Sequence, residues 1–354
     1  FGETLDGAED VLRTFVKQQY IEINQKALQE GYLVAPKRYE HLNGSYQDWM
    51  LVSGNNAVAL GAVAAGLRFY SAYPMSPSTS IMEALAAMGD EAGVVVEQAE
   101  DEIAAINMAI GASYAGARAM TGTSGGGFSL MVEALGLSGM AEIPLVVIDV
   151  QRPGPVTGLP TRTEQSDLRF VISASQGEFP RMVIALRNPE DAFYQTMRAF
   201  QLAEKYQIPV ILLSDQYLAD ATSTVKPFDA TRVQTVIAAA NLEKEDEYLR
   251  YRYTENGVSP RLIPGKTKHP VVIDSDEHDE RGQITESAEV RTKMMDKRMK
   301  KLEGIRQELQ EPELIGAGAF EILLVGWGST WGPIAEAVEL LNKAEKGKYA
   351  ALIF

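Results

Sequence analysis

The stretch from Gly93 to Gly127 constrains the fold of this 354-residue chain most strongly. Three consecutive valines, residues 94–96, predict a short buried strand of a parallel sheet. The apolar segment Ile103–Tyr114 predicts a helix that is buried on most sides, and acidic residues directly before it favour a helix start. Ala119–Thr123 predicts a second strand, which leads into a glycine-rich loop open to a ligand, residues 124–127. A carboxylate and a glycine loop would then lie at the carboxyl ends of neighbouring strands, where open α/β sheets bind ligands.

The same features have simpler explanations. Acidic residues in a first helical turn commonly serve as capping groups, and a glycine-rich turn after a strand is a common connection. The interpretation as a site therefore depends on the rest of the chain.

Alternating strand and helix patterns continue beyond this stretch. They recur at about one βα unit per 35 residues, which predicts a doubly wound parallel sheet of the α/β class. The further strands are expected at residues 69–73, 145–150, 181–185 and 210–214, and helices at 57–66, 81–88 and 189–204. In the last segment, strands are expected at 321–326 and from 349, and a helix at 333–342.

Composition shifts divide the chain into five parts. Residues 1–34 have a helical pattern and read as the end of a preceding domain, and residues 35–50 as a linker. The sheet domain occupies residues 51–225. A charged, strand-poor arm follows at 226–312, for which a solvated surface is expected, and a second, smaller α/β domain starts at 313–354.

Charge and composition exclude several classes of protein. The net charge of -15 argues against nucleic acid and anionic membranes as partners. The absence of cysteine excludes disulfides, a cysteine nucleophile and cysteine-ligated clusters in this chain. Without a long apolar run or a signal peptide, the cytoplasm is the expected compartment. Because the chain starts at Phe1 and stops in the apolar run 350–354, we expect it to be a fragment of a longer polypeptide.

Seven motifs, in order and with sensible spacing over residues 50–345, resemble the α subunit of the 2-oxoacid:ferredoxin oxidoreductases. Tyr73-Pro74-Met75-Ser76-Pro77 resembles the YPITP signature of that family, with serine in place of the usual threonine. The other motifs are QAEDE at 98–102, TSGGGFSL at 123–130, TGLPT with the following Gln165 and Asp167-Leu168 at 157–168, GVSPR at 257–261, EHDE at 277–280 and GWGST at 326–330.

This resemblance implies a thiamine diphosphate enzyme. Residues 51–225 would be the domain that binds the pyrimidine half of the coenzyme, residues 1–34 the end of a γ-type domain, and the segment from 313 the start of a transketolase-C-like domain. A partner β subunit would bind the diphosphate, Mg²⁺ and a [4Fe-4S] cluster, with coenzyme A as co-substrate and ferredoxin as electron acceptor. The expected assembly is a dimer of αβ heterodimers.

The resemblance assigns the catalytic acid to Glu100. Thiamine acts only if its C2 loses a proton, which requires a glutamate that shares a proton with N1′ of the pyrimidine. A carboxyl group in an apolar pocket suits this task. Glu97, Asp101 and Glu102 are the competing residues.

The substrate carboxylate requires a cation and a hydrogen-bond donor, ideally a guanidinium. Arg152 follows the strand expected at 145–150, and in the family the arginine at this strand end binds the carboxylate. The Ser76 hydroxyl is the expected second group. Arg162, in the following loop, is the rival arginine.

The remaining cofactor contacts are expected from Tyr73, Pro74, Ser124 and Gly125, with Gly126 in place of the proline usual in the family. None of the three histidines lies near the motifs that supply these cofactor contacts, and no metal site is predicted in this chain.

The expected reaction is oxidative, coenzyme A-dependent decarboxylation of 2-oxoglutarate to succinyl-CoA and CO2. Alternatives are the same chemistry on pyruvate or branched-chain 2-oxoacids, and a non-catalytic assembly module with the same fold. A nicotinamide-binding Rossmann protein is disfavoured because the G-x-G-x-x-G spacing is missing around Gly54 and Gly61.

Overall fold

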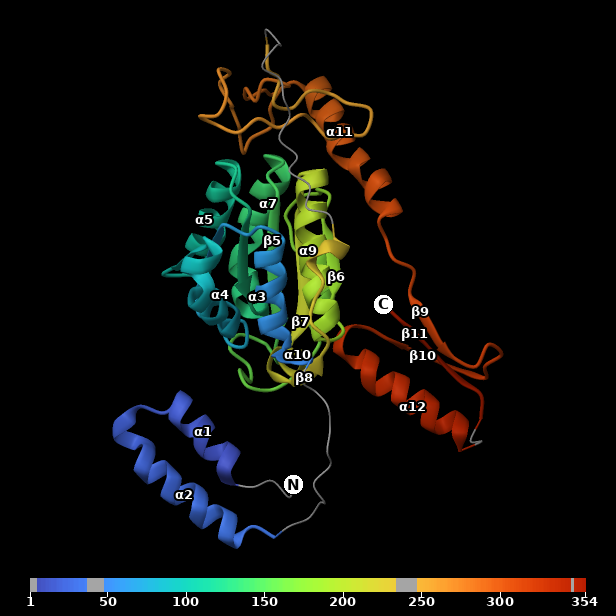
Figure 1. Ribbon diagram of the computed structural model, residues 1–354. Helices are drawn as coiled ribbons and strands as arrows, with labels where there is room; N and C mark the ends of the chain where they lie inside the picture. The colour runs from blue at the N-terminus through green and yellow to red at the C-terminus, as the bar shows by residue number, and fades with distance from the viewer. Residues whose placement is uncertain (1–4, 37–47, 234–246, 345–346) are drawn as a thin grey trace. The chain divides into compact units, whose positions relative to one another are not determined.

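The computed structural model (Figure 1) describes residues 5–36, 48–233, 247–344 and 347–354. The chain divides into two compact units, Phe1–Trp49 and Met50–Phe354. The first unit confirms the expected helical segment, although the expected linker lies mostly outside the described residues. Its elements are α1 (Leu5–Phe15), the 3-10 turn η1 (Gln18–Tyr20) and α2 (Ile21–Val34).

A six-stranded sheet with the order β3-β2-β4-β5-β7-β6 forms the centre of the second unit. All neighbouring strands run parallel, which confirms the predicted fold class. The strands are β2 (Phe69–Ala72), β3 (Val95–Gln98), β4 (Ala119–Thr123), β5 (Leu145–Gln151), β6 (Met182–Ala185) and β7 (Pro209–Asp215).

Helices cover both faces of this sheet, and each face has its own hydrophobic core. One core contains residues of α3, α4 and α9, and the other contains residues of α5, α6, α7 and α8. The bounds are α3 (Gly54–Ala64), α4 (Thr79–Ala92), α5 (Glu102–Tyr114), α6 (Gly125–Phe128), η2 (Ser129–Met131), α7 (Val132–Met140), α8 (Leu168–Ser173), α9 (Pro189–Tyr206) and α10 (Gln216–Asp220).

Local sequence explains the central elements. Every residue of β5 and β7 is buried, as expected for β-branched and leucine-rich runs between two helical layers. Helix α9 starts where Asn188 accepts a hydrogen bond from the Asp191 N–H and Pro189 takes the first helical position. The helix ends with Gln207 in the left-handed region, a common helix termination.

Two expectations for the central stretch are wrong in detail. Strand β3 lies at the edge of the sheet and is mostly exposed in this chain rather than buried. Helix α5 buries one face only, and Ile103 and Met108 on it are 51% and 42% exposed. Strand order, which a local pattern does not contain, decides both outcomes.

An antiparallel pair joins the two ends of the predicted sheet domain. Strand β1 (Met50–Ser53) pairs with β8 (Thr222–Val225). The expected domain boundaries themselves stay predictions.

The arm is strand-poor as expected over its described residues, but it is not simply a solvated surface. Helix α11 (Ala288–Gln307) buries Lys297, Arg298 and Lys301, and the arm also buries Arg250. Its ion pairs reach into the sheet domain, which periodicity and composition do not reveal. A short 3-10 turn, η3 (Ala230–Arg232), precedes it.

The last segment forms a three-stranded sheet with the order β10-β11-β9. Its predicted strands and helix are confirmed, and β9 was not predicted. The elements are β9 (Glu313–Gly316), β10 (Ile322–Gly326), η4 (Gly328–Thr330), α12 (Trp331–Lys343) and β11 (Tyr349–Ile353).

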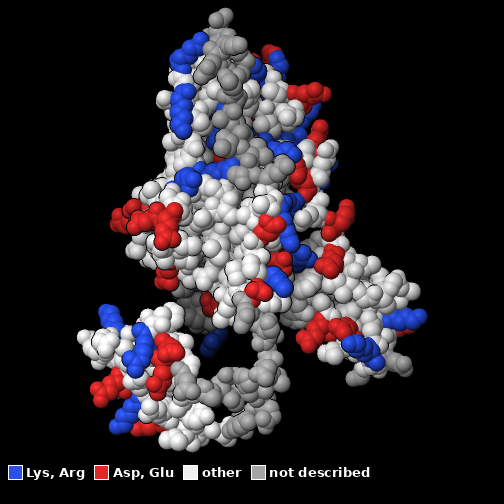
Figure 2. Space-filling view, in the orientation of Figure 1, with Lys and Arg blue, Asp and Glu red and all other residues white. Residues whose placement is uncertain are grey.

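On the face of the molecule shown in Figure 2, acidic and basic side chains are mixed.

Candidate active site

The carboxyl ends of four parallel strands carry the residues singled out by the sequence. Ser76 follows β2, Glu100 follows β3, Ser124 follows β4 and Arg152 follows β5. Because neighbouring strands run parallel, these ends lie together along the edge of the sheet formed by the carboxyl ends of its strands. This is the edge at which open α/β sheets bind ligands.

Arg152 and Ser76 meet directly across the end of β4. The Arg152 guanidinium donates a hydrogen bond through Nη1 to the Ser76 carbonyl oxygen at 2.6 Å. Arg152 is 7% exposed, whereas Ser76 is exposed. This contact fixes the guanidinium at the backbone of Ser76, and a guanidinium held in place is suited to bind a carboxylate ligand.

Arg162, the rival arginine, is exposed in the loop between β5 and α8. Its backbone N–H donates to the Leu159 carbonyl in a local turn. Burial at the strand ends therefore favours Arg152.

The two central candidates for the catalytic acid differ sharply in burial. Glu100, the predicted acid, is exposed in the loop before α5. Glu102, one of its named competitors, is 3% exposed in the first turn of α5, and its Oε1 has no hydrogen-bond partner among the described residues. Asp101, another competitor, is the helix cap: its side chain accepts from the Ala104 N–H at 2.7 Å. Glu102 therefore fits an acid in a pocket better than Glu100 does.

The glycine-rich segment after β4 is a short helix, α6, rather than the expected loop. Ser124 is fully buried, and its hydroxyl lacks a partner among the described residues. A Cβ atom on Gly127 would collide with Thr123 Oγ1 and Glu102 Oε1, so these two side chains lie close together. The lack of side chains at 125–127 therefore lets the backbone pack against the acid.

Tyr73 and Pro74 lie between β2 and α4, and Tyr73 is 38% exposed. Both stand at the same sheet edge as Ser124. Their predicted contacts with the coenzyme stay predictions.

Sequence reasoning missed a buried aspartate beside this edge. Asp149 is fully buried within β5, and neither carboxylate oxygen has a partner among the described residues. Burial raises the pKa of the Asp149 carboxyl well above its usual value, and the charge of Asp167 adds to this effect. An aspartate within the apolar run 145–150 was the available signal. We call the following residues the polar cluster: Glu102, Thr121, Thr123, Ser124, Asp149 and Asp167.

His278 has a structural environment in the arm. Its Nδ1 lies 2.9 Å from the Asp276 carbonyl, and its ring packs on Tyr251. Nowhere in the described ranges do three or more His, Asp or Glu side chains form a group that could hold a metal ion.

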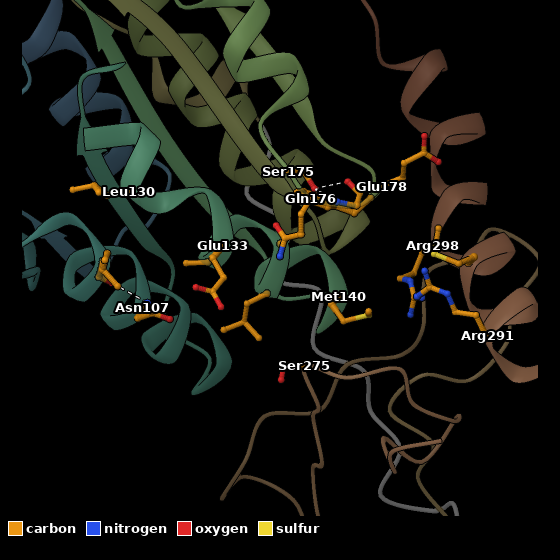
Figure 3. Close-up of a pocket in the computed structure, with 17 residues that line it drawn as sticks. Asn107, Leu130, Glu133, Met140, Ser175, Gln176, Glu178, Ser275, Arg291 and Arg298 are labelled. Carbon is orange, nitrogen blue, oxygen red and sulfur yellow. Dashed lines mark hydrogen bonds between the residues drawn. The ribbon is translucent and has the colours of Figure 1, made fainter. Parts of the chain in front are cut away.

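A separate cavity of about 550 Å³ lies between α5, α7, the loop before β6 and α11 (Figure 3). Arg291 and Arg298 extend to it from α11, and Glu133 and Met140 line it from α7. Both arginines already bind Glu277. The cavity contains none of the predicted site residues.

Together, the sheet, the helices on both of its faces and the polar residues at the carboxyl ends of its strands define a three-layered α/β domain of a ligand-binding class. Residues 60–297 match the family model "Pyruvate flavodoxin/ferredoxin oxidoreductase, thiamine diP-bdg". The chain therefore belongs to this family and contains its thiamine diphosphate-binding domain.

Individual relatives agree with this assignment. The chain is 41% identical over 355 residues to 2-oxoacid:ferredoxin oxidoreductase 1, subunit alpha, of Sulfurisphaera tokodaii, covering 94% of this chain and 56% of that protein. It is 36% identical over 297 residues to the 2-oxoglutarate synthase subunit KorA of Methanocaldococcus jannaschii, covering 84% of this chain and 79% of that subunit. The chain thus spans about half the length of the relative from Sulfurisphaera.

A solved structure is similar over nearly the whole chain. It is the 2-oxoglutarate:ferredoxin oxidoreductase from Magnetococcus marinus with 2-oxoglutarate, coenzyme A and succinyl-CoA bound. The TM-score is 0.88 at 35% identity, over 98% of this chain and 61% of that chain. The described residues include no helix long and apolar enough to cross a bilayer.

Proposed function

We propose that this chain is part of the α subunit of a thiamine diphosphate-dependent 2-oxoacid:ferredoxin oxidoreductase. In the proposed reaction, a 2-oxoacid and coenzyme A yield an acyl-CoA and CO2, and two electrons pass to ferredoxin. The observation that carries this proposal is the placement of Arg152, Ser76 and a buried glutamate at one sheet edge of a domain from this family.

When bound, thiamine diphosphate would supply a nucleophilic carbon at C2 and a cationic thiazolium ring that accepts the electron pair released by decarboxylation. On this chain, the first turn of α5 supplies the acid that shares a proton with the pyrimidine N1′. Glu102 is our candidate, because it is buried and its Oε1 has no partner among the described residues, and Glu100 is the alternative predicted from the motif. Tyr73, Pro74, Ser124 and Gly125 would contact the pyrimidine half.

Arg152 would bind the substrate carboxylate, assisted by the Ser76 hydroxyl. A planar guanidinium can give a carboxylate two parallel hydrogen bonds, which fixes the orientation of the keto group. Replacing it by lysine keeps the charge but removes this geometry. Arg152→Lys should therefore impair use of the 2-oxoacid much more than binding of the coenzyme.

The proposed substrate is 2-oxoglutarate. Its support is the name of the relative from Methanocaldococcus jannaschii and the 2-oxoglutarate bound in the solved structure from Magnetococcus marinus. Pyruvate and branched-chain 2-oxoacids are the alternative substrates, and a non-catalytic assembly module is the alternative of a different class. The buried Arg152 and the unpartnered Glu102 favour an enzyme.

The proposed partner is a β subunit that holds the diphosphate, Mg²⁺ and a [4Fe-4S] cluster, in a dimer of αβ heterodimers. The relatives' description as an alpha subunit supports a second subunit. Helix α5 exposes the apolar side chains of Ile103 and Met108, which such a partner would cover.

The test uses the complex purified with its partner subunit. We expect thiamine-dependent reduction of a viologen dye with 2-oxoglutarate and coenzyme A, and much slower reduction with pyruvate or 2-oxoisovalerate. Glu102→Gln should lower turnover by roughly 10²-fold or more, as expected for loss of a proton-transferring group. A comparable loss in Glu100→Gln, with normal turnover in Glu102→Gln, would restore the motif-based assignment. Absence of dye reduction with all three acids would contradict the proposed function.

A further inference from the structure

Every member of the polar cluster except Thr123, whose hydroxyl donates to the Ser124 carbonyl at 3.3 Å, has a buried polar atom without a hydrogen-bond partner among the described residues. Glu102, Thr121, Thr123, Ser124 and Asp149 are at most 3% exposed. The cluster atoms without a hydrogen-bond partner in the described parts of the chain are Glu102 Oε1, Thr121 Oγ1, Ser124 Oγ, both Asp149 carboxylate oxygens and Asp167 Oδ2. Burial of so many unpaired groups in one place is costly unless something else satisfies them.

These side chains form a continuous series. Thr123 and Asp149 are register partners on adjacent strands, so their side chains lie beside each other on the same sheet face. At one end, a Cβ on Gly127 would touch both Thr123 and Glu102. At the other end, a Cβ on Gly125 would collide with the Asp167 carboxylate. Bare backbone around α6 thus packs against both ends of the series.

The chemistry of the members suits proton transfer. A neutral carboxyl group donates one hydrogen bond and accepts others, and a threonine or serine hydroxyl does the same. Asp149 is held towards its neutral form by burial and by Asp167, and the pKa of Asp167 is itself raised by burial and by Glu164. Asp167 is only partly buried, so the series reaches from the buried acid towards solvent.

We propose that the polar cluster is a hydrogen-bonded path, completed by water, that carries a proton between Asp149 and Glu102, with Asp149 as a positioning residue for the acid of the thiamine site. This inference rests on the proposed function. One proton leaves the Asp149 carboxyl and one arrives at Glu102 Oε1 through the Thr123 hydroxyl, which gives up its hydrogen bond to the Ser124 carbonyl to pass the proton on. Asp149 regains its proton from solvent by way of Asp167, and no electrons move.

The first test detects the path without turnover. In infrared difference spectra of the purified complex at neutral pH, we expect a carbonyl band of a protonated carboxylic acid that disappears in Asp149→Asn. Glu102→Gln should shift this band, because the two groups are coupled, whereas Glu100→Gln should leave it in place. A wild-type complex without such a band, or a band that Glu102→Gln does not move, would overturn the path.

The second test interrupts the path at its centre. Thr123→Val keeps the shape of the side chain but removes the hydroxyl, and we expect kcat to fall about 10-fold with the KM for the 2-oxoacid unchanged. Thr123→Ser keeps the hydroxyl and should have most of the wild-type kcat. The acid limb of its pH–kcat profile should also match that of the wild type. Thr196→Val, at a buried threonine of α9 on the other face of the sheet, is the matched control and should retain wild-type kcat.

Failure of this inference differs from failure of the proposed function. If Thr123→Val turns over at the wild-type rate while Glu102→Gln is inactive, the proposed proton path is wrong and the assignment of Glu102 as the acid is supported. If the wild-type complex shows no thiamine-dependent turnover but retains the coupled infrared band, the path exists and the proposed reaction is wrong.

Discussion

Two buried polar regions of the second unit differ in whether their carboxyl groups are paired with cations. In the region we call the arm network, each carboxylate lies against two cations. Glu142 Oε1 and Oε2 lie 2.5 Å from Lys297 Nζ and Lys301 Nζ, and Glu277 binds Arg291 and Arg298. In the polar cluster, by contrast, Asp149 faces hydroxyls and another acid.

The pKa directions follow this difference. Burial raises the pKa of the Glu142 carboxyl, but the charges of Lys301, Lys297 and Arg250 outweigh it and hold the pKa well below its usual range. At Asp149 no cation of the described residues opposes the effect of burial, and the pKa is raised. Paired buried charges can anchor one part of a fold to another. A buried acid without a cationic partner indicates a functional role instead.

The largest expected effect is on the arm network. Glu142→Gln leaves Lys297 and Lys301 buried without their counter-charge and should lower the free energy of unfolding by about 3–5 kcal/mol. Chemical denaturation of the complex measures this change. Glu133→Gln, at an exposed glutamate of α7, is the control and should stay within about 0.5 kcal/mol of wild type. Equal stability of the two variants would show that the network does not anchor the arm.

A smaller effect is expected at the glycine turn of the site. Gly127→Ala places a methyl group against Thr123 and Glu102 and should displace the acid, which we expect to cost about 10²-fold in kcat. Gly111→Ala, on the same helical layer with no atom near its Cβ position, is the control. Steady-state kinetics of both variants test this, and wild-type kcat in Gly127→Ala would contradict the placement of Glu102.

The smallest effect is a change in the pH dependence of stability. Because the folded-state pKa of Asp149 is raised, the folded chain holds a proton that the unfolded chain releases above about pH 4. Asp149 therefore contributes less to stability as the pH rises from about 4 towards its folded-state pKa. Asp149→Asn removes this loss and should be more stable than wild type by about 1 kcal/mol at pH 8, but not at pH 4. Denaturation midpoints at the two pH values measure it, and a parallel pH dependence in both proteins would argue that Asp149 is charged when folded.

Local sequence was sufficient for most elements of the fold. Strands such as β5 and β7, and helix α9, were predicted close to their observed bounds from the alternation of strand and helix patterns. The edge position of β3 was not predictable in this way, because it depends on which strands become neighbours. The buried lysines of α11 were missed for a similar reason, since their partner Glu142 is 155 residues away from Lys297.

The site shows the same limit. Ser76 and Arg152, chosen from motifs and strand ends, are in contact because both follow parallel strands of one sheet, and their roles at the substrate stay predictions. The choice between Glu100 and Glu102 depends on where α5 begins and which side chain faces the core, because Glu100 lies exposed in the loop before α5 and Glu102 is buried in its first turn. Asp149 was not predicted as a site residue, because the polar groups around it come from β4 and from the loop after β5.

Exchange of the C2 proton of bound thiamine diphosphate with deuterium tests the central claim most directly, because it reports activation of the coenzyme without substrate or electron transfer. The measurement uses the complex of this chain with its partner subunit, followed by quenched-flow NMR. We predict that Glu102→Gln slows the exchange by roughly 10²-fold or more, while the coenzyme stays bound. Exchange at the wild-type rate in Glu102→Gln, with the coenzyme bound, would contradict the assignment of the activating acid to the first turn of α5.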